Sequence, residues 1–174
     1  TQLDILDEVW SDRPALPDAP IYEHLAPFAV VNRADKLAAV REQMQAKGAN
    51  WHFVSTVDDI AWIFNLRGAD VNYNPVFVSH ALIGLDSATL FVPLNKVSQQ
   101  ITASLAKDGI TCQPYENAAS ALQNLNASTT LLIDPRRITY GFRQALAPQA
   151  SVIEAINPSV LAKSRKTAEE AQFV

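Results

Sequence analysis

The chain has 174 residues, of which 48% are hydrophobic and 18% are charged, a balance typical of a globular protein with a buried core and not of a disordered one. The formal net charge is −4, and no run of lysine or arginine provides the basic surface that nucleic-acid binding requires. No apolar run approaches the roughly 18 residues of a membrane helix. We therefore expect neither nucleic acid nor a membrane as a partner. A single cysteine, Cys112, excludes an internal disulfide and is expected to be a buried structural thiol.

The first 20 residues are expected to lie outside the main domain. Apolar residues between Leu3 and Trp10 recur at helical spacing, as in the tail of a helix. Three prolines follow between Ser11 and Pro20, where they remove backbone donors and disfavour helix. The sequence thus predicts the tail of a preceding domain and a proline-rich linker over residues 1–20.

Residues 21–160 are predicted to form one α/β domain in which helices and strands alternate. The strands are expected at 51–55, 76–85, 88–92, 110–115, 129–133 and 151–155, and the helices at 32–48, 56–68, 97–109, 118–125 and 138–146. The run 76–85 is apolar on both faces, which is typical of a strand in the middle of a covered sheet. A turn at Asp86-Ser87 makes 88–92 its antiparallel partner. We expect three layers, with a mixed β-sheet flanked by helices on both faces.

The last residues are expected to begin a further domain. Asn157-Pro158 interrupts the alternation, and 163–172 starts as a charged helix with Thr167 and Glu170 spaced as a capping box. No core segment remains for this helix to pack against. Residues 161–174 are therefore predicted to be the start of another domain.

Candidate metal ligands and acid–base groups are few. His24, His52 and His80 are isolated from one another; we expect His24 to be exposed and the other two to be hydrogen-bonded structural residues within strands. The pair Asp58-Asp59 could be a metal or acid–base dyad, but adjacent carboxylates before a helix are more often caps.

Motifs of nucleophilic catalysis and phosphate binding are absent. No GxSxG, GxGxxG or P-loop sequence occurs, and Ser55 and Ser79 fall in strand patterns without an obvious base. We therefore assign no catalytic residue and no metal ligand in this chain.

The segment DDIAWIFNLRGADVNYNPVF, residues 58–77, remains as the candidate functional stretch. It reads as a short apolar helix that presents Arg67 and then a polar loop. An arginine in that position can bind a carboxylate of a substrate or of another chain. It can equally neutralise the carbonyls at the end of its own helix, or pair with Asp70. The spacing leaves both possibilities open.

This segment resembles the D-E/D-I-A-W-x-x-N-L-R-G-x-D-x-x-x-N-P-V-F pattern of the second, creatinase-like N-terminal domain of three-domain Xaa-Pro aminopeptidases. Val9-Trp10-Ser11-Asp12-Arg13-Pro14 is similar to the W-x-D-R-P linker that precedes this domain in the family. The stretch from Lys163 to Glu170 resembles the K-x-x-K-N/T-x-x-E sequence at the start of the catalytic domain.

The resemblance implies a creatinase N-terminal-like fold in a metallopeptidase that releases the N-terminal residue from peptides with proline second. In the family, two divalent metals, usually manganese, are held by two Asp, one His and two Glu of a pita-bread catalytic domain, which would start near Lys163 here. None of these ligands maps onto this chain, so no cofactor is expected within it. His80 departs from the aromatic residue associated with its position.

For this chain the resemblance implies an accessory, non-catalytic domain that shapes access to the cleft and contributes to dimer contacts, with Arg67, Asp70 and Asn74 as the residues involved. The implied partners are the catalytic domain, a second copy in a homodimer and a peptide with proline second, in the cytoplasm. Two alternatives stay open: a binding module of a catalytically inactive relative of the histone-chaperone type, and the N-terminal domain of a prolidase or creatinase.

Overall fold

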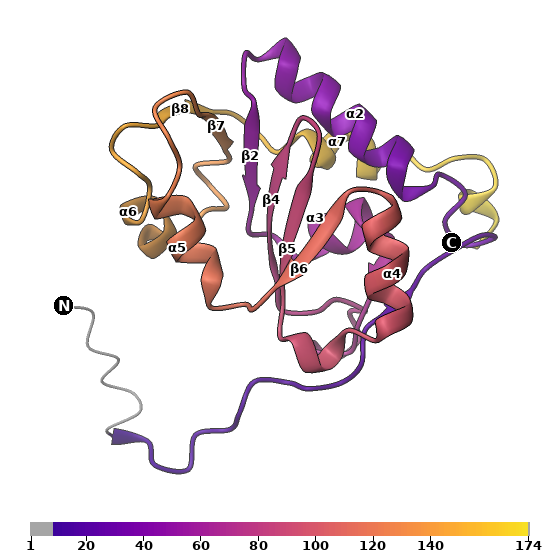
Figure 1. The fold of residues 1–174 in the computed structure, drawn as a ribbon. Helices are drawn as coiled ribbons and strands as arrows, with labels where there is room; N and C mark the ends of the chain where they lie inside the picture. Colours follow the sequence, from indigo (N-terminus) through magenta and orange to yellow (C-terminus); the bar gives the residue numbers. More distant parts are fainter. Residues whose placement is uncertain (1–8, 174) are drawn as a thin grey trace.

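The computed structural model describes residues 9–173, which form a six-stranded sheet covered by helices (Figure 1). The apolar part of the tail helix expected between Leu3 and Trp10 lies mostly outside the described residues. The strands of the sheet are β2 (Trp51–Val54), β4 (His80–Gly84), β5 (Ala88–Phe91), β6 (Ile110–Gln113), β7 (Thr130–Ile133) and β8 (Ser151–Glu154). No helix of this part of the chain is long and apolar enough to cross a membrane.

The sheet is mixed, with the order β6-β5-β4-β2-β7-β8. β4 pairs antiparallel with both β2 and β5, whereas the pairs β5–β6, β2–β7 and β7–β8 are parallel. Five strands therefore run in one direction and β4 runs against them. The N-terminal end of β4 consequently lies at the edge where the other five strands have their carboxyl ends.

Helices cover both faces, as the sequence predicts. One core cluster packs side chains of α2 (Arg33–Ala46), α3 (Val57–Ile63) and α4 (Gln99–Lys107) against the sheet, and the other packs α5 (Asn117–Gln123) beside α6 (Tyr140–Gln144). In Figure 1, α5 and α6 lie on one side of the sheet and α2 on the other. Along β4, Ala81 and Ile83 belong to the first cluster and Leu82 to the second, so alternation is what divides this strand between two cores.

Local signals fix the ends of the long helix. The side chain of Asn32 accepts a hydrogen bond from the backbone of Asp35 at 2.8 Å, and Asp35 lies in the first turn, where the helix dipole favours an acid. Gly48, with φ of 76°, follows the last turn. The helix expected over 32–48 is thus confirmed, with Asn32 as its cap and Gly48 just beyond its end.

Several predicted boundaries were wrong. The strand expected over 76–85 is only β4, because 76–79 forms an irregular segment in which the backbone N–H of Val78 is taken by Asp70 at 2.7 Å. The helix expected to reach Gly68 ends at Ile63 and is followed by β3 (Leu66–Arg67), which pairs antiparallel with β1 (Tyr22–Glu23). The helix expected over 138–146 is only Tyr140–Gln144.

The charged helix expected over 163–172 is not formed as one helix, because one helix ends at Ser164 and a short 3₁₀ helix begins at Glu170. Pro158 is not a breaker there but the first residue of α7 (Pro158–Ser164), a position where its missing N–H costs nothing. Thr167 and Glu170 form the predicted capping box, with reciprocal hydrogen bonds of 3.1 and 3.2 Å, at the start of the 3₁₀ helix η2 (Glu170–Phe173). Both elements lie against this domain, next to α2 and α3.

Candidate functional site

Arg67 owes its direction to a left-handed turn between α3 and β3. Asn65 has φ of 49°, a conformation that asparagine tolerates better than most residues. Its buried side chain donates to the carbonyl of Val31 at 3.0 Å and accepts from Lys36 Nζ at 2.6 Å. The turn places Leu66 in the core and leaves Arg67 half-buried at the surface.

The guanidinium of Arg67 binds the end of its own helix. Its Nη1 donates to the carbonyl of Ala61 at 2.7 Å and to that of Leu66 at 2.9 Å. Burial lowers the pKa of Arg67 from its usual value, and Tyr22 acts in the opposite direction. The guanidinium nevertheless stays charged at neutral pH, because the usual pKa of arginine is so high. Of the two roles that the spacing left open, the structure shows the helix-end contact, and Arg67 does not pair with Asp70.

Gly68 is required by a close approach of two backbones. A Cβ at this position would lie 2.7 Å from Cβ of Phe77 and 3.1 Å from the carbonyl oxygen of Val76. Further hydrogen bonds, from Gly68 N to Pro75 O at 3.3 Å and from Asp70 N to Val76 O at 3.1 Å, close the base of a loop. Each residue of the N-L-R-G sequence at 65–68 thus has its own role. The first forms the left-handed turn, the second packs in the core, the third binds the end of the helix, and the fourth allows the close backbone contact.

Asp70 lies inside the protein and not on its surface. Its carboxylate pairs with Lys96 of the 3₁₀ helix η1 (Leu94–Lys96), and both side chains have 0% exposure. The same carboxylate accepts the N–H of Val78, and Lys96 also donates to the carbonyl of Pro17 at 3.3 Å. Asp70 therefore fixes the loop and offers nothing to an external partner.

The tip of this loop is fully exposed. Val71 and Asn74 form an isolated antiparallel bridge, and between them Tyr73 has φ of 63° and a relative exposure of 107%. Asn74 is also exposed. The loop therefore has a buried base and a tip that is available for contacts.

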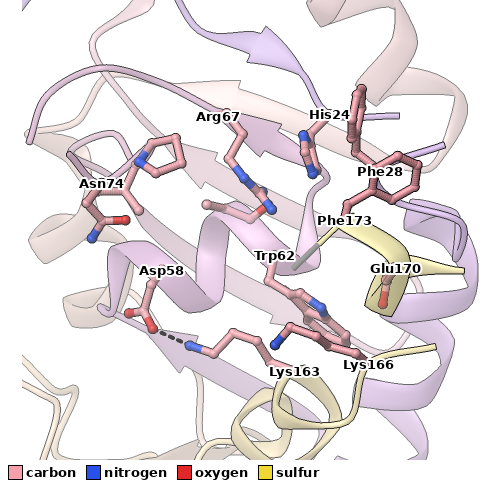
Figure 2. Close-up of a pocket in the computed structure, with 13 residues that line it drawn as sticks. His24, Phe28, Asp58, Trp62, Arg67, Asn74, Lys163, Lys166, Glu170 and Phe173 are labelled. Atoms are coloured by element: carbon pink, nitrogen blue, oxygen red, sulfur yellow. Dashed lines mark hydrogen bonds and ion pairs between the residues drawn. The ribbon is translucent and has the colours of Figure 1, made fainter. Parts of the chain in front are cut away.

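A pocket of about 410 Å³ brings Arg67 and Asn74 together with residues far away in the sequence (Figure 2). One side comes from the segment before α2 and from α3, and the other from α7 and η2. The lining residues are His24, Phe28, Asp58, Ala61, Trp62, Arg67, Asn74, Pro75, Val76, Lys163, Lys166, Glu170 and Phe173. Of the three candidate residues, the structure brings Arg67 and Asn74 to one site and leaves Asp70 out of it.

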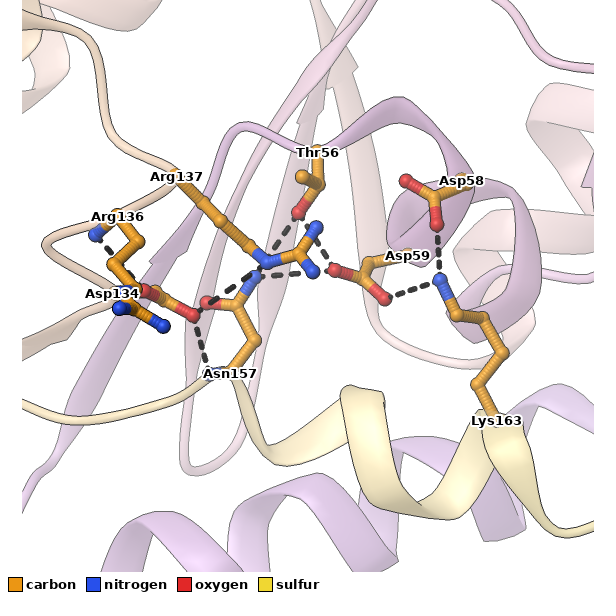
Figure 3. Close-up of polar contacts among 8 residues, drawn as sticks. All are labelled: Thr56, Asp58, Asp59, Asp134, Arg136, Arg137, Asn157 and Lys163. Carbon is orange, nitrogen blue, oxygen red and sulfur yellow. Dashed lines mark hydrogen bonds and ion pairs between the residues drawn. The ribbon is translucent and has the colours of Figure 1, made fainter.

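A polar network holds α7 against the start of α3 (Figure 3). Lys163 pairs with Asp58, and its Nζ lies 2.8 Å from Oδ1 of Asp59. Oδ2 of Asp59 accepts from Thr56 Oγ1 at 2.7 Å and from Asn157 Nδ2 at 3.1 Å. The backbone N–H of Asn157 donates in turn to Asp134 at 3.1 Å.

These contacts decide what Asp58 and Asp59 do. Burial raises the pKa of Asp59, but the hydrogen bonds from Lys163, Thr56 and Asn157 outweigh it, so the pKa is lowered overall. Both carboxylates lie in the first turn of α3, where the dipole favours them, but the N-cap residue is Thr56, and no side chain makes a cap hydrogen bond there. They bind α7 instead, which is a structural role other than the cap that we predicted.

His52 and His80 are structural histidines, as predicted. Nδ1 of His52 lies 3.0 Å from the carbonyl oxygen of Leu132, and Nδ1 of His80 lies 3.1 Å from Oγ of Ser55. Burial lowers the pKa of each to about 4, so both are neutral at pH 7. His24, expected to be exposed, is half-buried and lines the pocket, where its ring stacks on Phe28 at 6.0 Å.

His80 takes part in an aromatic cluster at the carboxyl edge of the sheet. Its ring stacks on Tyr115 at 4.8 Å and on Phe53 at 5.8 Å, and Phe142 approaches edge-on at 4.4 Å. A neutral imidazole packs there as an aromatic ring does. The unexpected residue thus keeps the aromatic character of its position.

The remaining candidates for chemistry stay structural. Burial raises the pKa of the half-buried Cys112 thiol, while Arg33 lowers it, and a raised pKa makes a thiol less reactive. Within residues 9–173, no three His, Cys, Asp or Glu side chains lie close enough together to hold a metal ion.

Sequence reasoning missed several residues of the site. Trp62 lay within the recognised segment, but nothing marked it as a pocket wall. Lys166 lay in the stretch that resembles the start of the catalytic domain, but nothing there pointed to this pocket, and Phe28 and Phe173 gave no signal, since only the folded chain brings these residues to Arg67. Lys96, the partner of Asp70, lies in a stretch with no recognisable motif, so no local pattern could have identified it.

Comparison with known proteins places the chain in a family. The family model described as the Creatinase/Prolidase N-terminal domain matches residues 12–170. A probable Xaa-Pro aminopeptidase P of Neurospora crassa is 33% identical over 177 aligned positions, which cover 95% of this chain and 26% of the relative. Its counterpart in Sordaria macrospora is 34% identical, with coverage of 95% and 29%. The chain thus spans less than a third of the length of these relatives.

Solved structures share the fold. An X-prolyl aminopeptidase from Caenorhabditis elegans, described as a cytosolic enzyme with a di-nuclear active site, superposes with a TM-score of 0.88 at 23% identity, covering 99% of this chain and 29% of that one. A prolidase from Pyrococcus horikoshii gives a TM-score of 0.52 at 19% identity, with coverage of 79% and 37%. By sequence match over nearly its whole length, and with the mixed sheet and two helical layers described above, the chain belongs to the creatinase/prolidase N-terminal domain family.

Proposed function

We propose that this chain is the non-catalytic accessory domain of an Xaa-Pro aminopeptidase, a metallopeptidase that releases the N-terminal residue from peptides with proline second. The observation that carries the proposal is the match over 95% of the chain to relatives that are probable Xaa-Pro aminopeptidases. The pocket around Arg67 and Asn74 supports a role in shaping access to the cleft.

The chemistry of the reaction is assigned to another part of the longer protein. The family implies two divalent metals, for which manganese is our proposal, but the acidic groups described here do not fit them. Asp58 and Asp59 share Lys163, and Asp70 is buried against Lys96. We therefore derive no metal-dependent step from this chain. Residues 161–174 are proposed to lead into the catalytic domain, with residues 1–20 as the preceding tail and linker.

Two wider properties are part of the same proposal. A homodimer in which this domain contributes contacts would use the exposed loop tip at Tyr73 and Asn74, since the base of the loop is buried. A cytoplasmic location is proposed by analogy with the C. elegans enzyme, which is described as cytosolic.

Activity measurements on the longer protein that carries this chain test the proposal. We expect manganese-dependent release of alanine from Ala-Pro-Phe by the longer protein, and no release by the 174-residue chain alone. Turnover by the chain alone would contradict the non-catalytic role. Absence of turnover in the longer protein, combined with histone binding, would instead favour the chaperone-type alternative, and preference for the dipeptide Ala-Pro would favour a prolidase.

A variant separates the role of Arg67 from its contribution to stability. Arg67→Ala removes a helix-end contact and a pocket wall, so we expect a loss of kcat/KM of about tenfold, the size of one charged hydrogen bond. Arg41→Ala is a matched control, because Arg41 is also half-buried and its Nε donates to a backbone carbonyl, that of Gly84 at 2.9 Å, but it lies outside the pocket. If the two variants have the same kcat/KM, the role of Arg67 is purely structural.

A further inference from the structure

The pocket beside Arg67 has aromatic walls. Ring centroids of Phe28 and Phe173 lie 5.1 Å apart at an interplanar angle of 59°, and the ring of His24 also stacks on Phe28. Trp62 adds a third aromatic side chain to an apolar lining that also includes Ala61, Pro75 and Val76. Phe28 and Phe173 are each more than half exposed in this chain, at 55% and 53%.

The pocket also carries positive charge that the described residues leave unmatched. Of its two carboxylates, Asp58 pairs with Lys163, whereas Glu170 accepts the backbone N–H of Thr167 and keeps a negative charge that also acts on His24 and Lys36. Arg67, by contrast, binds only backbone carbonyls, and Lys166 has no hydrogen bond or ion pair with residues 9–173. Two cations thus face one pocket without a carboxylate partner.

The protein environment adds to this field. Lys36 lies just behind the wall, with Nζ 4.4 Å from the ring centroid of Trp62. The pKa of His24 is lowered by burial first and then by the charges of Arg67 and Lys36, which outweigh the opposing charge of Glu170, as expected where the net potential is positive. An anion is the ligand that such a potential favours.

We propose that this pocket binds the free C-terminal carboxylate of a short peptide, with Arg67 and Lys166 contacting the carboxylate and Trp62, Phe28 and Phe173 contacting its last side chain. The inference rests on the proposed function, because that function supplies a peptide as the ligand. It deepens that function by giving the domain a recognition role at the end of the substrate that is not cleaved.

The geometry favours a carboxylate with an attached apolar group over a free inorganic anion. Nη1 of Arg67 is fixed by Ala61 and Leu66, which sets the plane of the guanidinium and leaves its other N–H groups for a planar, two-oxygen acceptor. In Figure 2 this guanidinium lies among His24 and Trp62, so a group bound to it meets rings on its remaining sides. The amide of Asn74 also lines the pocket and offers a peptide backbone both a donor and an acceptor.

A binding measurement on the 174-residue chain tests the proposal without any turnover. The probes are N-acetyl-Pro-Phe with a free carboxylate, the same dipeptide as its C-terminal amide, and inorganic phosphate. Binding is followed by the NMR shifts of the Trp62 indole N–H and the Arg67 Nε–H. We expect the acid to bind at least about tenfold more tightly than the amide, because a charge-assisted hydrogen bond is lost in the amide.

A pair of neighbouring lysine and arginine variants provides the control. Lys166→Gln should abolish the preference for the acid, whereas Arg165→Gln should leave it unchanged, since Arg165 is equally exposed but does not line this pocket. Equal affinity for acid and amide, or displacement of the acid by an equal concentration of phosphate, would overturn the assignment. Because no cleavage is measured, this failure is distinct from failure of the proposed peptidase role.

Discussion

Two regions of this domain bury polar groups in opposite ways. Beneath the loop that follows Arg67, the fully buried Asp70 and Lys96 side chains keep their charges by pairing. At the carboxyl edge of the sheet, His80 is buried among Phe53, Tyr115 and Phe142 and loses its charge, with a pKa lowered to about 4 by burial. Both solutions avoid an isolated buried charge, but they respond differently to mutation and to pH.

The largest effect is expected where one member of the ion pair is removed. Lys96→Met leaves the Asp70 carboxylate buried without its cation, so we expect a loss of about 3–5 kcal/mol in the free energy of unfolding. Urea titration of the wild type and the variant measures it. The double variant Lys96→Met/Asp70→Asn removes both charges and should recover most of the loss. A cost below about 1 kcal/mol for the single variant would show that water reaches the pair.

The neutral region should respond to acid instead. In the unfolded chain a histidine has a pKa near 6.5, whereas His52 and His80 have pKa values of about 4 in the folded chain. The unfolded state therefore binds more protons between these values. Stability is fully present above about pH 6.5 and falls as the pH drops toward 4, by at most about 3 kcal/mol for each histidine.

His80→Phe isolates one of the two contributions. The variant keeps an aromatic ring in the cluster and removes the titrating group. Its unfolding is therefore coupled to the uptake of one proton fewer, and its free energy of unfolding should fall less steeply than that of the wild type between pH 7 and pH 4.5. His52 stays in place and preserves its share of the pH dependence. An unchanged pH profile in chemical denaturation would mean that His80 is not buried as a neutral group.

The smallest effects are expected from the two left-handed residues on either side of Arg67. Asn65→Gly removes the side-chain bonds to Val31 and Lys36 and should lower stability by about 2 kcal/mol. Tyr73→Gly relieves left-handed backbone at a fully exposed position, and the extra freedom of glycine in the unfolded chain offsets this gain. We expect a change below about 0.5 kcal/mol by thermal unfolding, and a large loss would reveal contacts made by Tyr73.

Much of the fold was predictable because its signals are local. Asn32, Gly48 and Gly109 mark helix ends, and alternation along β4 assigned Ala81 and Leu82 to opposite faces. One of the wrong boundaries has a clear physical cause. The apolar run 76–79 satisfies strand propensity, but Asp70, eight residues earlier, takes the N–H of Val78. Propensity does not report such a competitor.

The candidate site was predictable only in part for the same reason. Arg67 and Asn74 stand out in the sequence, and the structure places both in one pocket. Asp70 is as prominent in the sequence pattern, but in the structure its carboxylate is buried against Lys96, which is 26 residues away in the sequence. Pro158 was read as a breaker, although proline at the first position of a helix is favourable, so α7 and its contacts with Asp58 and Asp59 were missed.

Lys96 also shortens the part of the proline-rich segment that can act as a linker. Its Nζ donates to the carbonyl of Pro17, and its own carbonyl accepts the backbone N–H of Ile21 at 3.0 Å. Residues 17–21 are therefore attached to the domain, which leaves residues 11–16 as the linker expected before it. Six extended residues span at most about 20 Å. This short radius limits how far any preceding part of the protein could swing relative to the sheet.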